Sequence, residues 1–473
     1  MKIFLHSILL AVAVCIASAM TAQLRLPAII ASGMVLQQND SATLWGWAGP
    51  SEKVSILTGW NNQRYEATTD RNAHWSQKVK TPAAGGPYTI TIETRGVPVV
   101  LQDVLIGEVW VCSGQSNMEW SYYNGEKDTR EELSHAANDQ IRFFQVPKTT
   151  AAYPQDDVKA QWQHCDSNTL KGFSAVGYFF GKKLNSDLQV PIGLINASWG
   201  GTPAEVWTPA PSIASDDALV AAAAKQEPRP WWPFQPGYAY NAMLAPLTSF
   251  QIAGAIWYQG EGNTGTNDTY AKLLTAMIDG WRSAWNKPFP FYLVQIAPFK
   301  YGNYNVGALL QEAETKVATH PRTGMVVITD LVDSVTNIHP SHKREVGNRL
   351  ANMALGENYG KTDIQYKSPS IASAEAVKGK LVLSFNDAPG GLMIRGKSAT
   401  GFYIADDSGN FMPADAKLDK GKIILSNKAI KEPKYVRYSF SNTETGNVFS
   451  VNGLPLAPFR TDTLKVDQSK LTD

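Results

Sequence analysis

Cysteine is scarce in this chain of 473 residues, which carries three: Cys15, Cys112 and Cys165. Cys15 lies in an apolar N-terminal stretch with the features of a signal peptide, so two cysteines remain for the folded protein. Small secreted domains are stabilised by several disulfides, and two thiols exclude such a framework. Free cysteine is among the most buried residue types. The sequence therefore predicts two buried thiols.

Metal-ligand patterns are missing as well. Six histidines follow the N-terminal stretch, and His339 with His342 is their one close pair. Cysteine and histidine do not recur at the spacing of a zinc site. We therefore predict a protein without a metal centre.

The chain also lacks an excess of charge of either sign. It has 43 Lys and Arg against 42 Asp and Glu, a formal net charge of +1. Proteins that bind nucleic acids usually present a strongly basic face, so bulk charge gives no support for a nucleic-acid partner. Tryptophan, in contrast, is abundant, with 14 residues. Because exposed indoles stack on sugar rings, this count slightly favours a carbohydrate ligand.

Long apolar runs are absent except at the N-terminus. There the largely apolar stretch Ile8–Ala19 follows Lys2, and small residues precede Gln23. This pattern predicts a signal peptide over residues 1–22 and a secreted or periplasmic protein. The run is too short for a membrane span, and no other stretch approaches the required length.

The remaining chain divides into three regions by its apolar pattern. Residues 23–103 and 365–473 contain short runs of alternating apolar residues separated by turn residues, which predicts two β-sandwich-like modules. Residues 104–360 alternate apolar strands with helical stretches, the pattern of an α/β domain. Its expected strands are 109–113, 190–196, 254–258, 291–296 and 324–329, and its expected helices lie near 172–185, 268–284, 305–318 and 341–355.

The most informative stretch is Gly107–Met118. An apolar strand ends there in a small polar turn that contains Gln115 and Ser116. Open α/β sheets bind ligands at the carboxyl ends of their strands. Ser116 is therefore a candidate nucleophile, provided that a histidine reaches it. The alternative is a purely structural turn serine.

His339 is the histidine best placed to do so. It follows the expected strand 324–329, and Pro340 disfavours helical geometry at His339, which keeps it in the loop. A neutral imidazole at this position could accept the proton of a serine. The alternative for a lone histidine is a hydrogen-bonded polar residue without a catalytic role.

Two further blocks follow expected strands. Gln259 and Asn263 carry amides that can donate to an oxyanion, and Glu261 between them can either orient the histidine or cap a loop. Gly200 and Gly201 permit close approach of the backbone, so we expect one of their N–H groups to complete an oxyanion hole.

Taken in order, these blocks resemble the sialate O-acetylesterase family of the SGNH/GDSL hydrolase superfamily. The resemblance covers nearly the whole chain after residue 22, and it is specific because of the order and number of its motifs. They are Gly33–Gln37, Gly107–Met118, Asn196–Thr202, Trp207, Tyr240–Leu247, Ile256–Glu261, Ile338–Pro340 with Lys343, and Gly453–Asp462.

The resemblance implies a flavodoxin-like three-layer α/β/α domain flanked by the two β modules. It implies removal of O-acetyl groups from carbohydrates without a cofactor, with Ser116 as the nucleophile and His339 as the general base. The Ser116 N–H, the Gly200–Gly201 turn and a side chain of the 259–263 block match the oxyanion hole, and Gln115 matches a residue of the turn or the substrate site.

The chain differs from many SGNH hydrolases at the acidic residue that orients the catalytic histidine. Many SGNH hydrolases carry an aspartate three residues before the histidine, where this chain has Thr336. Glu261 is the first choice for this role, Asp333 and Asp330 are alternatives, and a Ser–His dyad without an acid is the remaining one. The roles are defined by geometry, which the sequence does not contain.

The substrate stays open at this point. The family name suggests O-acetylated sialic acid, and acetylated xylan or another plant glycan is the alternative. A sialate carboxylate needs a cationic partner, and the candidates are Arg142, Arg229 and Lys300. Arg395 and Arg460 are weaker candidates, because they lie in the C-terminal β module. The proline- and aromatic-rich segment 228–234 is either a substrate-covering loop or a packed linker.

Two readings from other classes compete with an acetylesterase. A non-catalytic carbohydrate-binding protein would not need Ser116, His339 and the oxyanion blocks together. An α/β-hydrolase lipase or peptidase would need a second glycine after the serine, where this chain has Met118. The sequence does not determine the oligomeric state.

Overall fold

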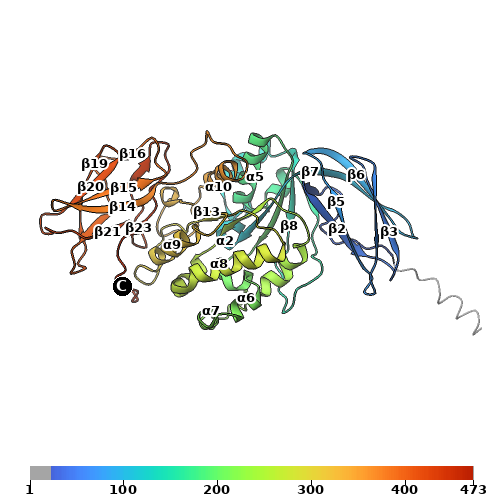
Figure 1. The fold of residues 1–473 in the computed structure, drawn as a ribbon, viewed down its shortest axis with the longest axis horizontal. Helices are drawn as coiled ribbons and strands as arrows, with labels where there is room; N and C mark the ends of the chain where they lie inside the picture. The colour runs from blue at the N-terminus through green and yellow to red at the C-terminus, as the bar shows by residue number, and fades with distance from the viewer. Residues whose placement is uncertain (1–22, 472–473) are drawn as a thin grey trace, which may run out of the picture.

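The computed structural model describes residues 23–471, and the predicted signal peptide over residues 1–22 lies outside them. Three regions follow one another along the long axis of the molecule (Figure 1). The N-terminal β region and the C-terminal β region lie at opposite ends, with the α/β region between them. Among the described residues, no helix has the length and apolar character needed to cross a membrane.

The middle region is built on one sheet whose core strands are parallel. In the order β13-β12-β11-β7-β10-β8 neighbouring strands run in the same direction, and β9 pairs antiparallel to β8 at the edge. The strands are β7 (Val99–Gly114), β8 (Asn138–Gln145), β9 (Trp162–Cys165), β10 (Ile192–Ser198), β11 (Gly254–Tyr258), β12 (Phe291–Val294) and β13 (Thr323–Val326).

Helices cover both faces of this sheet. Trp110 and Cys112 of β7 share one apolar cluster with α5 (Ala175–Leu188) and α10 (Lys343–Glu357). Val109 and Val111, which alternate with them along the strand, share the other cluster with α8 (Asn267–Ala284) and α9 (Val306–Val317). These four helices and five of the strands confirm the expected elements, whereas β8 and β9 were not predicted.

The N-terminal β region is joined to this sheet by a shared strand. β7 is 16 residues long, and its first half pairs with β6 (Gly85–Glu93) while its second half pairs with β10 and β11. The predicted boundary between residues 103 and 104 therefore lies inside β7. The other strands of the region are β1 (Val35–Gln37), β2 (Ser41–Trp47), β3 (Lys53–Thr58), β4 (Gln63–Thr68) and β5 (His74–Lys80).

The C-terminal β region has two four-stranded antiparallel sheets and a two-stranded one around its own apolar core. The first sheet contains β14 (Ser370–Val377), β15 (Lys380–Asn386), β20 (Lys422–Ser426) and β19 (Asp415–Asp419), and the second β18 (Met412–Pro413), β17 (Phe402–Ala405), β21 (Tyr435–Tyr438) and β23 (Phe459–Arg460). The pair is β16 (Leu392–Ile394) with β22 (Val448–Ser450). This confirms β structure after the α/β region.

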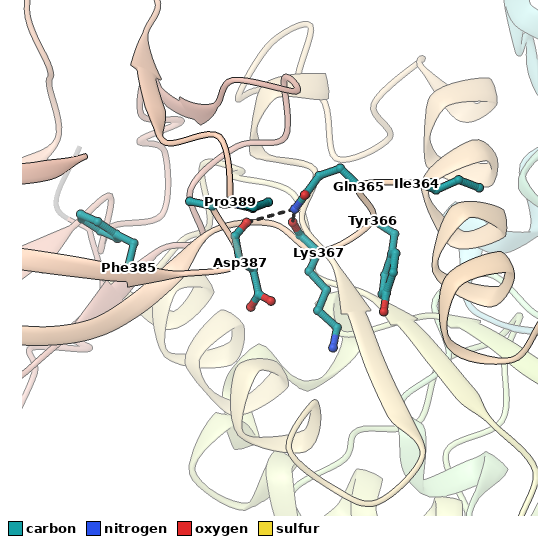
Figure 2. Close-up of a pocket in the computed structure, with 8 residues that line it drawn as sticks. Ile364, Gln365, Tyr366, Lys367, Phe385, Asp387 and Pro389 are labelled. Atoms are coloured by element: carbon teal, nitrogen blue, oxygen red, sulfur yellow. Dashed lines mark hydrogen bonds between the residues drawn. The ribbon is translucent and has the colours of Figure 1, made fainter. Parts of the chain in front are cut away.

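A pocket lies at the junction between α10 and the C-terminal β region (Figure 2). Its volume is about 500 Å³, and it is lined by residues 364–367 together with the end of β15 and the loop after it. The Gln365 side-chain amide donates to the carbonyl oxygens of Lys367 and Asp387, at 2.9 and 3.0 Å (Figure 2). These bonds tie the segment after α10 to the β15–β16 loop.

Candidate active site

Ser116 stands at the carboxyl end of β7, at the first residue of the short helix α2 (Ser116–Glu119). The turn depends on Gly114, which has φ +136°, and a Cβ added there would lie 2.2 Å from the Tyr258 carbonyl oxygen. Only glycine fits this conformation and this close approach of β7 to β11. The backbone thus carries the serine out of the sheet at the edge where ligands bind in open α/β folds.

His339 reaches Ser116 from the loop before α10. Its Nε2 lies 2.9 Å from Ser116 Oγ, although the two residues are 223 positions apart in the sequence. The imidazole stacks on the indole of Trp120, with 3.9 Å between ring centroids. Burial, with a smaller contribution from Lys343, lowers the pKa of His339 to about 4. The ring is therefore neutral at physiological pH and able to accept the serine proton.

None of the three expected acids contacts this histidine. Glu261 accepts a hydrogen bond from the Asn117 side chain at 2.6 Å, Asp333 lies 3.3 Å from His342, and Asp330 pairs with Arg349 at 2.7 Å. Within residues 23–471, no carboxylate forms a hydrogen bond with the imidazole of His339. The direct contact expected between Glu261 and the histidine is absent, and the site contains a Ser–His pair.

Asn117 connects the serine turn to the histidine loop. Its side-chain NH₂ donates to Glu261 and, at 3.0 Å, to the carbonyl oxygen of Ile338, the residue before His339. Its side-chain oxygen accepts from the Lys343 ammonium at 2.5 Å. Burial lowers the pKa of Lys343 to about 7, opposed by the charge of Glu261, and burial also raises the pKa of Glu261. Glu261 is thus linked to the histidine loop by hydrogen bonds through Asn117 and has no direct bond to the imidazole.

The side-chain amides expected in the oxyanion hole donate hydrogen bonds to other groups of the protein. Gln259 donates to the Thr202 carbonyl and to Asn263 Oδ1, at 3.3 and 2.8 Å. The Asn263 NH₂ donates to Glu205 and Thr266, at 2.8 and 3.2 Å. Both side chains are fully buried. Each of the two amides thus donates two hydrogen bonds within the protein. The expected role of Gln259 and Asn263 as oxyanion donors does not agree with these bonds.

Gln115 also supports the turn from within. Its side-chain oxygen accepts hydrogen bonds from the backbone N–H groups of Gly260 and Gly262, at 3.3 and 3.1 Å. These contacts hold the loop after β11 against the end of β7. Gln115 is buried, so it shapes the site without lining it.

The Gly200–Gly201 turn lies directly beside the serine. A Cβ on Gly200 would lie 3.4 Å from Ser116 Cβ, and the Gly200 N–H donates to Glu119 Oε2 at 2.5 Å. Gly201 has φ +80°, and a Cβ there would lie 2.3 Å from the Trp232 ring. Gly200 therefore lies beside the serine, and in this structure its N–H donates to a carboxylate, so its role as an oxyanion donor stays a prediction.

The pocket around Ser116 is aromatic. Its volume is about 280 Å³, and its lining residues are Ser116, Glu119, Trp120, Asn124, Lys148, Trp199, Gly200, Trp231 and Trp232. Trp231 is 66% exposed, and its carbonyl accepts a hydrogen bond from the Trp199 indole at 3.0 Å. Of the two alternatives for segment 228–234, this placement favours a loop at the substrate site.

Lys148, Glu119 and Trp120 are pocket residues that the sequence did not single out. None of the cations that it did single out lines the pocket. Arg229 forms a β-bridge with the pocket residue Trp232, but its side chain pairs with Glu227. The others have partners or places of their own: Arg142 pairs with Asp103, Arg460 pairs with Glu312, Arg395 stacks on Phe449, and Lys300 is not among the lining residues. Lys148 follows the unpredicted strand β8, so its place at the carboxyl edge of the sheet was not visible without that strand.

Comparisons with known proteins show which family this chain resembles. The model of a carbohydrate esterase family, described as sialic acid-specific acetylesterase, matches residues 106–356. Sialate O-acetylesterases of Pongo abelii and Homo sapiens are each 31% identical over 404 residues, covering 76% of this chain and 76% of theirs. A solved carbohydrate acetylesterase from Xanthomonas citri is 34% identical, with a TM-score of 0.85, and covers 93% of this chain and 100% of its own.

The α/β fold and these relatives define the chain as a carboxylic ester hydrolase, which excludes a merely sugar-binding protein. More closely, the chain belongs to the carbohydrate esterase family of sialic acid-specific acetylesterases. The resemblance seen in its motifs is thereby confirmed.

Proposed function

We propose that this protein removes O-acetyl groups from sialic acids through an acetyl-enzyme formed on Ser116. The observation that carries the proposal is the 2.9 Å contact between Ser116 Oγ and His339 Nε2, with Ser116 lining an aromatic pocket. A nucleophile and a base within hydrogen-bond reach are the minimum for covalent acyl transfer. The names of the mammalian relatives support sialic acid as the sugar.

In the first half-reaction, Ser116 Oγ attacks the acetyl carbonyl carbon while His339 Nε2 takes the serine proton. The tetrahedral intermediate carries its negative charge on the former carbonyl oxygen, beside the N–H groups of Ser116 and Gly200. Each such donor is worth roughly 3–4 kcal/mol. The intermediate collapses, the C–O bond to the sugar breaks, and His339 returns the proton to the leaving hydroxyl.

In the second half-reaction, His339 removes a proton from water, which attacks the acetyl-enzyme. Collapse of this second intermediate releases acetate and restores the serine hydroxyl. Stacking on Trp120 and the Asn117 bond to the Ile338 carbonyl position the imidazole in the proposed dyad. Parallel strands with helices on both faces support the three-layer SGNH arrangement for the catalytic region. We also propose that the protein is exported, on the pattern of residues 1–22.

The test is acetate release from O-acetylated sialosides and, in parallel, from acetylated xylo-oligosaccharides. We expect the wild type to act on the sialosides, and Ser116→Ala to lose at least about a thousandfold in kcat. Circular dichroism on the same samples checks that the variant is folded. A folded Ser116→Ala protein with near-normal turnover would overturn the nucleophile, and activity on the xylo-oligosaccharides alone would overturn the substrate.

A further inference from the structure

A carboxylate of the protein itself occupies the oxyanion donor beside Ser116. Glu119 lies three residues after the serine on α2, and its Oε2 accepts the Gly200 N–H at 2.5 Å. Its other oxygen forms an ion pair with the Lys148 ammonium. The proposed mechanism needs this N–H for the developing oxyanion, so Glu119 has to leave it when a substrate reacts.

Lys148 is the one basic residue among those that line the pocket; the others are aromatic, small or neutral, apart from Glu119. Both members of the ion pair are accessible, with 44% of the Lys148 side chain and 27% of the Glu119 side chain exposed. An exposed ion pair of this kind contributes little to stability, because water screens both charges. A second carboxylate entering the pocket can therefore compete with Glu119 for the ammonium.

We propose that Lys148 binds the carboxylate of an acidic sugar substrate, and that this exchange releases Glu119 from the Gly200 N–H. The inference rests on the proposed function and deepens it by assigning recognition of the substrate carboxylate to Lys148 and control of the Gly200 N–H to Glu119. Binding of the acid then frees the oxyanion donor in the same step. A neutral acetylated sugar leaves the ion pair in place and the Gly200 N–H occupied.

The dimensions of the site suit this exchange. Gly200 lies against Ser116, Glu119 contacts Gly200, and Lys148 contacts Glu119, so the nucleophile and the ammonium belong to one cavity of about 280 Å³. A single sugar acid carries its acetyl ester and its carboxylate on one small skeleton. The exposed indole of Trp231 offers the sugar ring an apolar surface at the rim.

The test compares an O-acetylated sialic acid with the same molecule whose carboxylate is capped as a methyl ester, with acetate release as the readout. A hydrogen bond between two charged groups is stronger than one to a neutral ester, so we expect kcat/KM for the free acid to exceed that for the methyl ester by about tenfold or more. Lys148→Met should bring this ratio close to one, and Lys148→Arg should retain it. Lys428→Met, which removes an exposed lysine of the C-terminal β region, is the matched control and should keep the wild-type ratio.

Glu119→Gln gives an independent arm. The neutral amide no longer competes for Lys148 and accepts the Gly200 N–H less strongly than a carboxylate. We expect a lower KM for the free acid and faster hydrolysis of the methyl ester. Labelling of Ser116 by a fluorophosphonate and the melting temperature show whether each variant is folded.

The outcomes separate this inference from the proposed function. If the wild type hydrolyses the free acid and the methyl ester equally well, or if Lys148→Met keeps the preference, the exchange at Lys148 is overturned while the sialate esterase stands. If neither sialate is cleaved but acetylated xylo-oligosaccharides are, both the proposed substrate and the inference about Lys148 are contradicted.

Discussion

At the scale of single residues, the proposed mechanism depends on an uncharged histidine. His339 is held on Trp120 in a half-buried position, which lowers its pKa from the usual 6.5 to about 4. The base form is the neutral form, and it predominates at every pH above this pKa. A profile of kcat/KM against pH reports the free enzyme.

We therefore expect kcat/KM for an aryl acetate to stay level as the pH falls from 7 to 5, and to decline only as it approaches about 4. An ordinary histidine base would lose half of its activity near pH 6.5. Stopped assays in buffers of constant ionic strength measure the pH at which kcat/KM declines. Returning each sample to pH 7 excludes irreversible acid unfolding. A decline in kcat/KM centred near pH 6.5 would contradict the buried, neutral histidine.

Glu261 provides a second prediction at this scale. In a serine triad, replacing the acid by its amide costs roughly 10⁴-fold in kcat, because the histidine is held in the wrong tautomer. Here Glu261 bonds to Asn117 and not to His339, and a glutamine can still accept the Asn117 N–H. Glu261→Gln should therefore lose only about tenfold in kcat, equivalent to about 1.4 kcal/mol, through weaker positioning of the loop.

The matched control for this variant is Asn117→Ala, which removes the bonds to Glu261, to the Ile338 carbonyl and to Lys343 together. We expect a larger loss than for Glu261→Gln, because the histidine loop loses its direct tie to the serine turn. Steady-state kinetics on an aryl acetate measure both. A loss near 10⁴-fold in Glu261→Gln would instead place the glutamate in a triad.

At the scale of elements, the segment 228–234 carries the aromatic rim of the pocket. Trp232 packs on Gly201, whereas Trp231 points largely to solvent. Trp231→Ala should raise KM for a sialoside with little change in kcat. The rise should correspond to about 1–2 kcal/mol of binding free energy, because the bound sugar loses its contact with the indole. The same variant should leave KM for a small aryl acetate nearly unchanged, and equal effects on both substrates would show that the loop was disturbed as a whole.

The sequence predicted most elements but not the contacts between them. Strand β11 was expected with its observed bounds, because an apolar run between glycine and a polar turn defines both ends. Strand β8 was missed because it begins with three polar residues and carries the buried Arg142. Ser116 and His339 were predicted because each follows a core strand. The partner of Glu261 and the place of Lys148 depend on side-chain directions across distant segments, which no local pattern contains.

At the scale of the whole molecule, β7 joins the N-terminal β region to the catalytic sheet, and Glu108 stands where they meet. Its buried carboxylate accepts hydrogen bonds from Gln37 at 3.0 Å, from Gln38 at 2.7 Å and from the Tyr359 hydroxyl at 2.6 Å. This network gives a structural reason for two of the family motifs, Gly33–Gln37 and the start of Gly107–Met118. One side chain thus connects β1, β7 and the segment after α10.

Glu108→Ala leaves these three donors without their acceptor; Gln37 is buried and Gln38 and Tyr359 are partly buried. A fully buried group that is left unsatisfied costs about 1–3 kcal/mol. We expect the free energy of unfolding to fall by about 3 kcal/mol, with smaller losses in Glu108→Gln, which keeps one acceptor oxygen. Since β7 belongs to both sheets, the N-terminal and catalytic strands should lose protection together. Hydrogen exchange read by mass spectrometry, comparing β3 and β6 with β10 and β11, measures this. Loss of protection in β3 and β6 alone, with β10 and β11 unchanged, would mean that β7 does not couple the two regions.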